Sequence, residues 1–162
     1  MTTMMKTLKK RFDREDEGFT LIELMVDVLI IAILLAIAIP TFLGARDRAN
    51  DRAAQSSLRN ALTAAKTLYT DSQDYTVATA ASLPSIEPSL SYSTVTSGSG
   101  DFKNVAVDAN SATAWIGAAL SKTGTCFGIK DTATGTQFAK ATPASGAACT
   151  TSTMTFSSTS KW

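Results

Sequence analysis

A long apolar segment with two acidic residues near its start most constrains what this chain can become. The segment covers residues 24–39 and is interrupted only by Asp27. Together with residues 19–22 before it, the segment is about long enough to cross a membrane, which takes ~20 residues in a helix. Because Glu23 and Asp27 are four residues apart, a helix places both carboxylates on one face.

A charged stretch precedes the apolar segment and stops at Gly18. It combines basic and acidic side chains, namely Lys6, Lys9, Lys10, Arg11, Asp13, Arg14, Glu15, Asp16 and Glu17. Basic residues before a span favour a cytoplasmic N-terminus. The chain after the span is then expected on the outer side of the membrane.

Three interpretations of this N-terminal region compete. An ordinary secretory signal peptide needs a small-residue cleavage site after the apolar segment, and "PTFLGARDR" after residue 39 matches such a site poorly. A plain signal anchor on an extracellular domain explains the span, but it explains neither the abrupt junction at Gly18 and Phe19 nor the acids. The third interpretation is cleavage before the apolar segment, which keeps that segment in the mature protein.

The stretch "GFTLIELMV" resembles the processing site of type IV prepilins and related pseudopilins, and "IAIPTFLGARDRAND" is similar to the next part of the helix in many pilins. In that family a dedicated membrane peptidase cuts after the glycine and methylates the new terminal amine. The resemblance, strong over residues 18–50, implies that residues 1–18 are a cleaved leader. The cut then falls between Gly18 and Phe19, and Phe19 becomes the N-methylated first residue.

The resemblance also assigns a role to one of the two acids. Glu23 becomes the fifth residue of the mature chain, where the family has a glutamate that is thought to pair with the terminal amine of a neighbouring subunit during assembly. The alternative is that Glu23 is simply solvated at headgroup level. Asp27 has no family role, since an apolar residue is usual there. It can be protonated, paired with a basic group of a neighbouring subunit, or unimportant where the membrane is thin.

Pro40 is the second residue to which the resemblance gives a role in assembly. Proline lacks the backbone donor and clashes with the preceding turn, and the helix of assembled pilins is often melted around it. The family often has a glycine about two turns earlier, where this chain has Ala32, a strong helix former. We therefore expect less melting, or melting confined to the residues just before Pro40, with Gly44 extending the soft region on the other side.

The helical pattern continues beyond the span and predicts one long helix over residues 19–74, of which about 19–42 cross the membrane and form the filament core. An apolar stripe for a globular domain has helical spacing, at Ala54, Leu58, Ala61, Leu62, Ala65, Leu68 and Tyr69. Just outside the span lies a charged cluster of Arg46, Asp47, Arg48, Asp51 and Arg52. This cluster is interpreted as a solvated, self-paired helix face or, alternatively, as contacts between subunits.

The remainder, residues 75–162, is predicted to form a β-rich globular domain. Residues 75–101 read as a loop region, since they contain Pro and Gly at intervals. Strands are expected at 104–109, 113–120 and 125–131, with weaker candidates in "GTQFAKA" and "TMTFSS". A small antiparallel sheet packed on the helix gives an α+β fold that is type IV pilin-like. The candidate core residues are Tyr92, Phe102, Trp115, Phe127, Ile129 and Phe138.

The two cysteines, Cys126 and Cys149, can form one disulfide but cannot supply a four-thiolate metal site. A bridge that closes a loop of this length stabilises a fold by roughly 3 kcal/mol on the chain-entropy account, and it requires an oxidising location. In the family a C-terminal cysteine pair often bounds a variable loop. Cys126 and Cys149 match this pattern only in part. Two unrelated free thiols are the alternative.

The composition argues against an enzyme. The chain has no histidine, which removes Ser-His-Asp and Cys-His catalysis and the commonest zinc ligand. No nucleophile–base pair, phosphate-binding loop or metal-ligand cluster is visible, so no catalytic residue, metal or cofactor is predicted. A net charge of +1 gives no electrostatic case for nucleic acid. DNA binding stays open but unsupported, through dispersed lysines that folding could gather: Lys103, Lys122, Lys130, Lys140 and Lys161.

The resemblance implies a structural subunit of a type IV pilus, with adhesion, twitching motility or DNA uptake as its role. The implied partners are further copies of the chain, a prepilin peptidase, and the inner-membrane assembly platform with its ATPase. The precursor is expected in the cytoplasmic membrane and the assembled chain outside the cell. The alternatives are a pseudopilin of a type II secretion system and a signal-anchored extracellular domain. Too few acids follow residue 100 for the calcium loop usual in major pseudopilins.

Overall fold

The computed structural model describes residues 18–94, 101–143, 148–158 and 162, without the side chains of Asn110 and Thr153. The chain divides into two compact units, Met1–Leu43 and Gly44–Trp162. Helix α2, Leu21–Ser72, supplies the described helical part of the first unit and the helical layer of the second. Most of the predicted leader, residues 1–17, lies outside the described residues.

Helix α2 ends where the sequence analysis places its end. Gln73 follows the last helical residue with a φ of 56°, and its N–H donates to the carbonyl of Tyr69 at 2.7 Å. A left-handed residue just after a helix satisfies an otherwise unpaired carbonyl in this way. The 52-residue helix therefore ends through a defined local conformation, although the capping residue is not the usual glycine.

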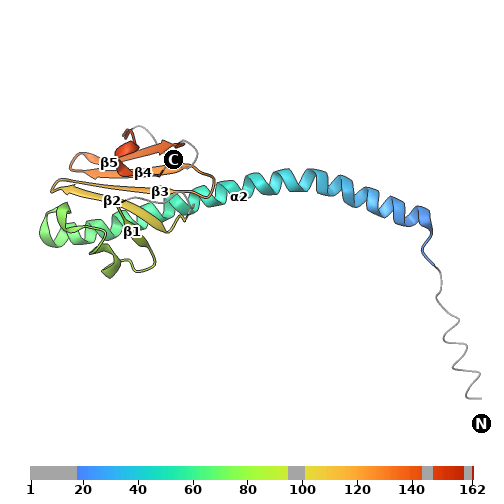
Figure 1. Ribbon diagram of the computed structural model, residues 1–162, viewed down its shortest axis with the longest axis horizontal. Helices are drawn as coiled ribbons and strands as arrows, with labels where there is room; N and C mark the ends of the chain where they lie inside the picture. Colours follow the sequence, from blue (N-terminus) through green and yellow to red (C-terminus); the bar gives the residue numbers. More distant parts are fainter. Residues whose placement is uncertain (1–17, 95–100, 144–147, 159–161) are drawn as a thin grey trace, which may run out of the picture. The chain divides into compact units, whose positions relative to one another are not determined.

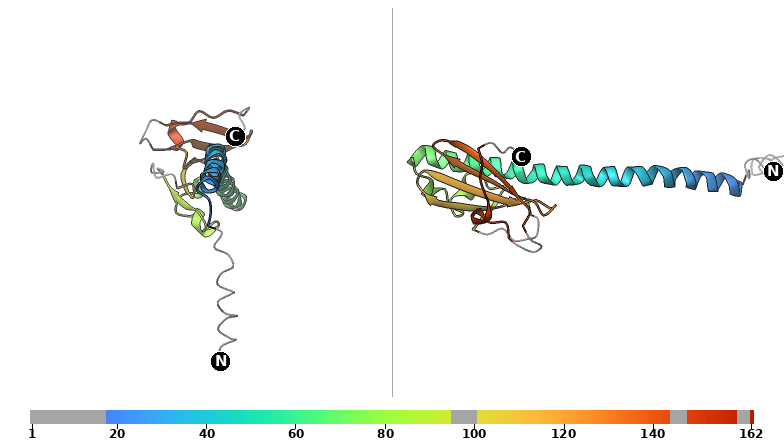
Figure 2. Two further views of the ribbon diagram at one scale, coloured as in Figure 1. Left: turned by 90° about the vertical axis from the view of Figure 1, so that its right-hand side faces the viewer. Right: turned by 90° about the horizontal axis from the view of Figure 1, so that it is seen from above.

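The second unit packs a five-stranded sheet on the C-terminal half of α2, as both Figure 1 and Figure 2 show. The strands lie in chain order across the sheet and comprise β1 (Ser91–Ser93), β2 (Asn104–Ser111), β3 (Ala114–Leu120), β4 (Cys126–Thr132) and β5 (Gly135–Ala141). The pairs from β2 to β5 are antiparallel. The expected α+β fold with a small sheet on a long helix is confirmed.

The main core lies between the sheet and the apolar stripe of α2. Five of the seven predicted stripe residues are buried, while Leu68 and Tyr69 are partly buried against them. Among the predicted sheet residues, Trp115, Phe127 and Ile129 are buried. The other three predicted core aromatics pack at its margin and are partly buried, namely Tyr92, Phe102 and Phe138.

The opposite face of the sheet is covered as well, which the sequence analysis did not expect. Ala118 and Leu120 in β3 are buried on this second face. They lie in a smaller apolar cluster with Cys126, Cys149 and Met154. The C-terminal segment thus covers this face, and the "TMTFSS" stretch contributes one isolated bridge, Ser157 to Phe138, in place of a strand.

The region predicted as a loop, residues 75–101, contains ordered structure in its described part. It holds two short 3₁₀ helices, η1 (Tyr75–Val77) and η2 (Leu83–Ser85), and strand β1. A third, η3 (Thr151–Thr153), lies in the C-terminal segment. The sheet is antiparallel as predicted except at this edge, where β1 pairs with β2 in parallel. Three residues give too short a pattern for a strand to be seen in the sequence.

A polar cluster joins α2 to β4 inside the second unit. Asp131 is buried, and its carboxylate lies 3.0 Å from Lys66 Nζ. The Tyr75 and Thr136 hydroxyls donate to its two oxygens at 2.7 and 2.6 Å. Burial alone raises the pKa of Asp131, but these hydrogen bonds and the Lys66 charge outweigh it and hold that pKa below its usual range. Burial and the same carboxylate raise the pKa of Tyr75.

The predicted disulfide is present between Cys126 and Cys149, 23 residues apart in the chain, with a Cα–Cα distance of 5.6 Å. This spacing lies in the ordinary range for a bridge. Cys126 begins β4 in the sheet, whereas Cys149 belongs to the segment that covers the sheet. The bridge therefore fixes the C-terminal segment to the second face of the sheet, and the alternative of two free thiols is excluded.

Candidate processing and assembly site

The N-terminus of α2 is fixed by a side-chain cap. Thr20 immediately precedes the helix, and its Oγ1 accepts a hydrogen bond from the N–H of Glu23 at 3.2 Å. A threonine at this position satisfies one of the backbone donors that a helix start leaves unpaired. The cap means that α2 begins within two residues of Phe19, and it places Glu23 in the first helical turn.

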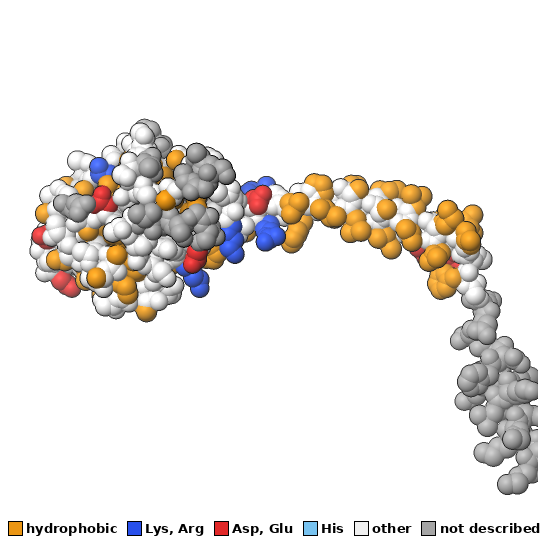
Figure 3. Space-filling view, viewed as in Figure 1, with side chains coloured by type: hydrophobic (Ala, Val, Ile, Leu, Met, Phe, Trp, Pro, Cys, Tyr) orange, Lys and Arg blue, Asp and Glu red, His pale blue; other side chains and the backbone are white. Residues whose placement is uncertain are grey.

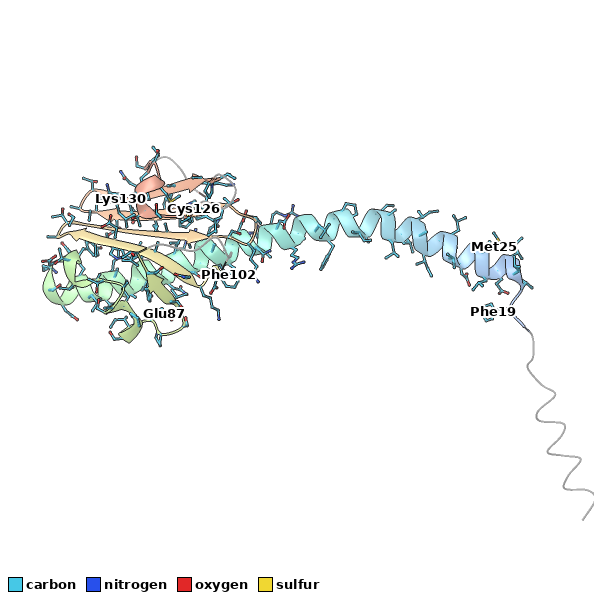
Figure 4. All side chains as sticks on the ribbon, viewed as in Figure 1. Phe19, Met25, Glu87, Phe102, Cys126 and Lys130 are labelled. Atoms are coloured by element: carbon cyan, nitrogen blue, oxygen red, sulfur yellow. A yellow bond between two sulfur atoms is a disulfide. The ribbon has the colours of Figure 1, made fainter. Side chains whose placement is uncertain are left out.

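The predicted cleavage site and Glu23 lie at the same surface hollow. Gly18, Phe19, Thr20 and Glu23 line it together, and Phe19, labelled in Figure 4, is 77% exposed. A Cβ placed on Gly18 meets no atom within 4 Å. The peptide bond between Gly18 and Phe19 is therefore accessible. The predicted cleavage there would leave a positively charged amine at the hollow that Glu23 also lines.

The N-terminal half of α2 exposes large apolar side chains at most of its positions, and Figure 3 shows one face of them. By length and composition α2 is the one helix of the described residues that is able to cross a membrane. Such a surface is stable only in lipid or against other apolar surfaces, since exposed apolar area is costly in water. The predicted site residues therefore lie at the start of a segment whose apolar side chains need lipid or another molecule to cover them.

Asp27 follows Glu23 on the same helical face, and both side chains are exposed. Neither carboxylate takes part in an ion pair within the part of the chain that the structure describes. No described residue of the chain thus supplies a cation to either of the acids that open the apolar segment.

Pro40 lies inside α2, which continues unbroken on both sides of it. The hydroxyl of Thr41 donates to the carbonyls of Ala38 and Ile37 at 2.9 and 3.2 Å. These side-chain bonds add to the turn that precedes the proline, where one backbone donor is missing. The single chain is therefore fully helical here, and melting around Pro40 in an assembled filament stays a prediction.

The charged cluster after the span does not form the predicted ion pairs within itself among the described residues. Arg46, Arg48 and Arg52 are exposed and form no ion pair among the residues that are described. Asp51 instead accepts a hydrogen bond from the hydroxyl of Thr123, in the turn after β3, at 2.6 Å. One acid of the cluster thus holds the domain to the helix, and the arginines stay available.

The structure shows no chemical centre besides these features. Among the described residues no group of His, Cys, Asp or Glu side chains has metal-binding geometry. The lysines considered for DNA binding do not share one environment, since Lys122 lies over the Phe102 ring and Lys140 over the Phe127 ring. Lys161 lies outside the described residues.

Sequence reasoning missed the Asp131 cluster and the Thr20 cap. Asp131, Lys66 and Tyr75 are far apart in the chain, so no spacing could have brought them together. The Thr20 cap was detectable, since a threonine three residues before a glutamate at the start of an apolar helix is a known N-terminal signature. The prepilin pattern in the same stretch was interpreted only through Gly18 and Glu23.

The fold, a long helix with an apolar first half and a mostly antiparallel sheet on its second half, is pilin-like. Residues 14–39 match the family described as the prokaryotic N-terminal methylation motif. These residues carry the methylation motif of prokaryotic prepilins, and part of the chain is homologous to type IV major pilins.

Two curated relatives define the similarity. The type IV major pilin protein PilA of Myxococcus xanthus is 43% identical over 65 residues, which are 40% of this chain and 30% of that protein. The type IV wide pilus major component PilA4 of Thermus thermophilus is 44% identical over 63 residues, 39% of this chain and 48% of that protein. The chain thus spans less than half the length of these relatives, and no solved structure matches it.

Proposed function

We propose that this chain is the precursor of a type IV pilus subunit. A prepilin peptidase removes residues 1–18 and methylates Phe19, and the mature chain then polymerises through the N-terminal half of α2 into a surface filament. Two relatives are named as a major pilin and a major pilus component, which favours this function over a secretion pseudopilin or a signal anchor.

The strongest support for the proposal is that the Gly18–Phe19 bond and Glu23 lie at one surface hollow. Before cleavage the nitrogen of Phe19 is an uncharged amide, and the Glu23 carboxylate forms no ion pair among the described residues. After cleavage the terminal amine carries a positive charge. In the filament, Glu23 of an incoming copy pairs with this amine on a copy already assembled, since opposite charges removed from water must pair.

The same arrangement explains the order of events. The leader prevents assembly while it is attached for two reasons. It keeps the nitrogen of Phe19 an uncharged amide, so Glu23 has no charged amine to pair with. It also keeps charged residues in front of the span. Cleavage releases the chain for assembly by a membrane platform and its ATPase. The precursor is held in the cytoplasmic membrane by α2 with its leader in the cytoplasm, and the filament lies outside the cell.

Substitution of Gly18 tests the proposal, because a side chain there meets no atom of the folded chain. We expect Gly18→Val to accumulate with its leader in the membrane and to be absent from filaments sheared off the cell surface, whereas the wild-type chain is abundant there. The Cys126–Cys149 bridge should form in both. Sheared filaments that contain the uncleaved Gly18→Val chain would overturn the proposal.

A further inference from the structure

Asp27 is the charged side chain in the apolar half of α2 that the proposed function leaves without a role. It is exposed, and no described residue of its own chain pairs with it. In a filament this segment is packed among other apolar helices, where an ionised carboxylate without a partner is costly. The amine of Phe19 is already taken by Glu23, so Asp27 needs a different cation.

The cations of α2 beyond the span are not equally available. Lys66 is paired with Asp131, and the Arg59 guanidinium lies over the Trp162 ring, 5.4 Å from its centroid. Arg48 and Arg52, in contrast, are exposed and make no ion pair among the described residues. They are four residues apart and so share one helical face, as Glu23 and Asp27 do.

Arg46 is chemically equivalent but lies elsewhere on the helix. Residues two apart in an α-helix do not face the same way, so Arg46 lies on nearly the opposite side from Arg48. Asp51, three residues after Arg48, has a carboxylate that already accepts the Thr123 hydroxyl. Among the described residues, the arginine face is therefore a pair of positive charges, one turn apart, that form no ion pair.

We propose that Asp27 of one copy pairs with the Arg48–Arg52 face of a second, parallel copy in the filament. This inference rests on the proposed function, since it needs copies that enter from one membrane in one orientation. Because Asp27 precedes the arginines along α2, the two copies must be offset along the helix axis. The Glu23–amine pair requires an offset between copies as well, so the two contacts together define the register of subunits.

This pairing gives Asp27 a specific role in place of general solvation. A charged pair between packed helices contributes mainly to register, because partners that are shifted by one turn leave both charges unpaired. Asp27 thereby selects one stagger among those that the apolar surface alone allows. A chain with leucine at this position would pack as readily but with less defined register.

Charge reversal in cells tests the inference by the amount of filament sheared from the surface. We expect Asp27→Arg, and separately Arg48→Asp with Arg52→Asp, to lower filament yield about tenfold, as like charges meet at the contact. The chain with all three substitutions should recover most of the yield. The matched comparison uses one arginine on each side: Asp27→Arg with Arg48→Asp should recover part of the yield, whereas Asp27→Arg with Arg46→Asp makes the same charge change on the other side of the helix and should not recover.

A second measurement does not depend on yield. Asp27→Cys combined with Arg48→Cys, treated with a short bis-maleimide, should give cross-linked chains in intact filaments, whereas Asp27→Cys with Arg46→Cys should not. Failure of both rescue and cross-linking in wild-type-like filaments would overturn the pairing and leave the pilin function standing. If the wild-type chain itself is absent from sheared filaments, the proposed function fails first.

Discussion

Lys66 on α2 and Asp131 on β4 form an ion pair with 3.0 Å between Nζ and Oδ1, which fixes the helix to the sheet. The two side chains differ in exposure, at 49% for Lys66 and 10% for Asp131. The lysine charge is therefore screened by solvent and contributes modestly. The larger effect comes from the buried carboxylate, which has three donors around it in the folded chain. Removing the carboxylate would leave these donors unpaired.

The stability of the domain is expected to fall at acid pH through Asp131. Because folding lowers the pKa of this carboxyl, the unfolded chain binds the proton at a higher pH than the folded chain. The stabilisation is complete above the unfolded value of about 3.9 and is lost as the pH falls through that value toward the folded pKa. Denaturant unfolding of the full chain in detergent between neutral and strongly acid pH measures this loss.

Asp131→Asn isolates the contribution of that carboxylate. It should lower the free energy of unfolding by about 1–3 kcal/mol at neutral pH, with a difference from wild type that shrinks below pH ~4. Asp47→Asn, at an exposed carboxylate of the helix, is the matched control and should change little. An unfolding free energy that depends on pH equally in wild type and Asp131→Asn would contradict this account.

Loss of the disulfide is expected to destabilise the second unit and free its C-terminal segment. The bridge closes a loop of 23 residues, and chain entropy gives it roughly 3 kcal/mol. Cys126→Ser with Cys149→Ser should lower the denaturation midpoint and expose Met154 to oxidation, since this side chain packs in the cluster that the bridge holds. Unchanged protection of Met154 would show that packing alone holds the segment.

Two glycines in the second unit should respond oppositely to alanine. A Cβ on Gly117 would lie 2.7 Å from the Trp115 ring and 3.4 Å from Leu58, and Trp115 cannot move freely, because its Nε1 donates to the Ala78 carbonyl at 3.1 Å. Gly117→Ala should cost about 1–3 kcal/mol through overpacking. Thermal unfolding of the full chain in detergent measures the change.

Gly44→Ala provides the counterpart on α2. There a Cβ meets only the flexible Arg48 side chain, at an ordinary 3.7 Å. Since alanine favours a helix interior by up to about 1 kcal/mol over glycine, this variant should be neutral or more stable. A destabilised Gly44→Ala chain with an unaffected Gly117→Ala chain would mean that the packing of β3 on α2 is misjudged.

The sequence predicted the main elements because their signals are local. The apolar stripe of α2 and the three stronger strands follow from spacing alone, as do the buried Trp115 and Phe127. Gly18, Phe19 and Glu23 were predicted as site residues from a short motif that resembles the prepilin processing site, and their roles stay predictions. These predictions needed no knowledge of which distant segments meet.

The features that the sequence could not predict depend on contacts between distant segments. The burial of Ala118 and Leu120 requires the C-terminal segment to cross the sheet, and nothing in β3 itself indicates that. The parallel edge strand β1 is too short to carry a pattern. The Asp131 cluster joins four elements, α2, η1, β4 and β5, so its members looked like isolated polar residues until the fold brought them together.

The central claim is that cleavage after Gly18 creates the positively charged amine with which Glu23 of another copy pairs. The most direct test is the mass of the N-terminal peptide of the chain in filaments sheared from the cell surface. The account predicts a chain that begins at Phe19 and carries one added methyl group on its terminal amine. A chain that begins in the region of Met1, or after residue 40, would contradict it and leave a signal anchor or an ordinary secreted domain.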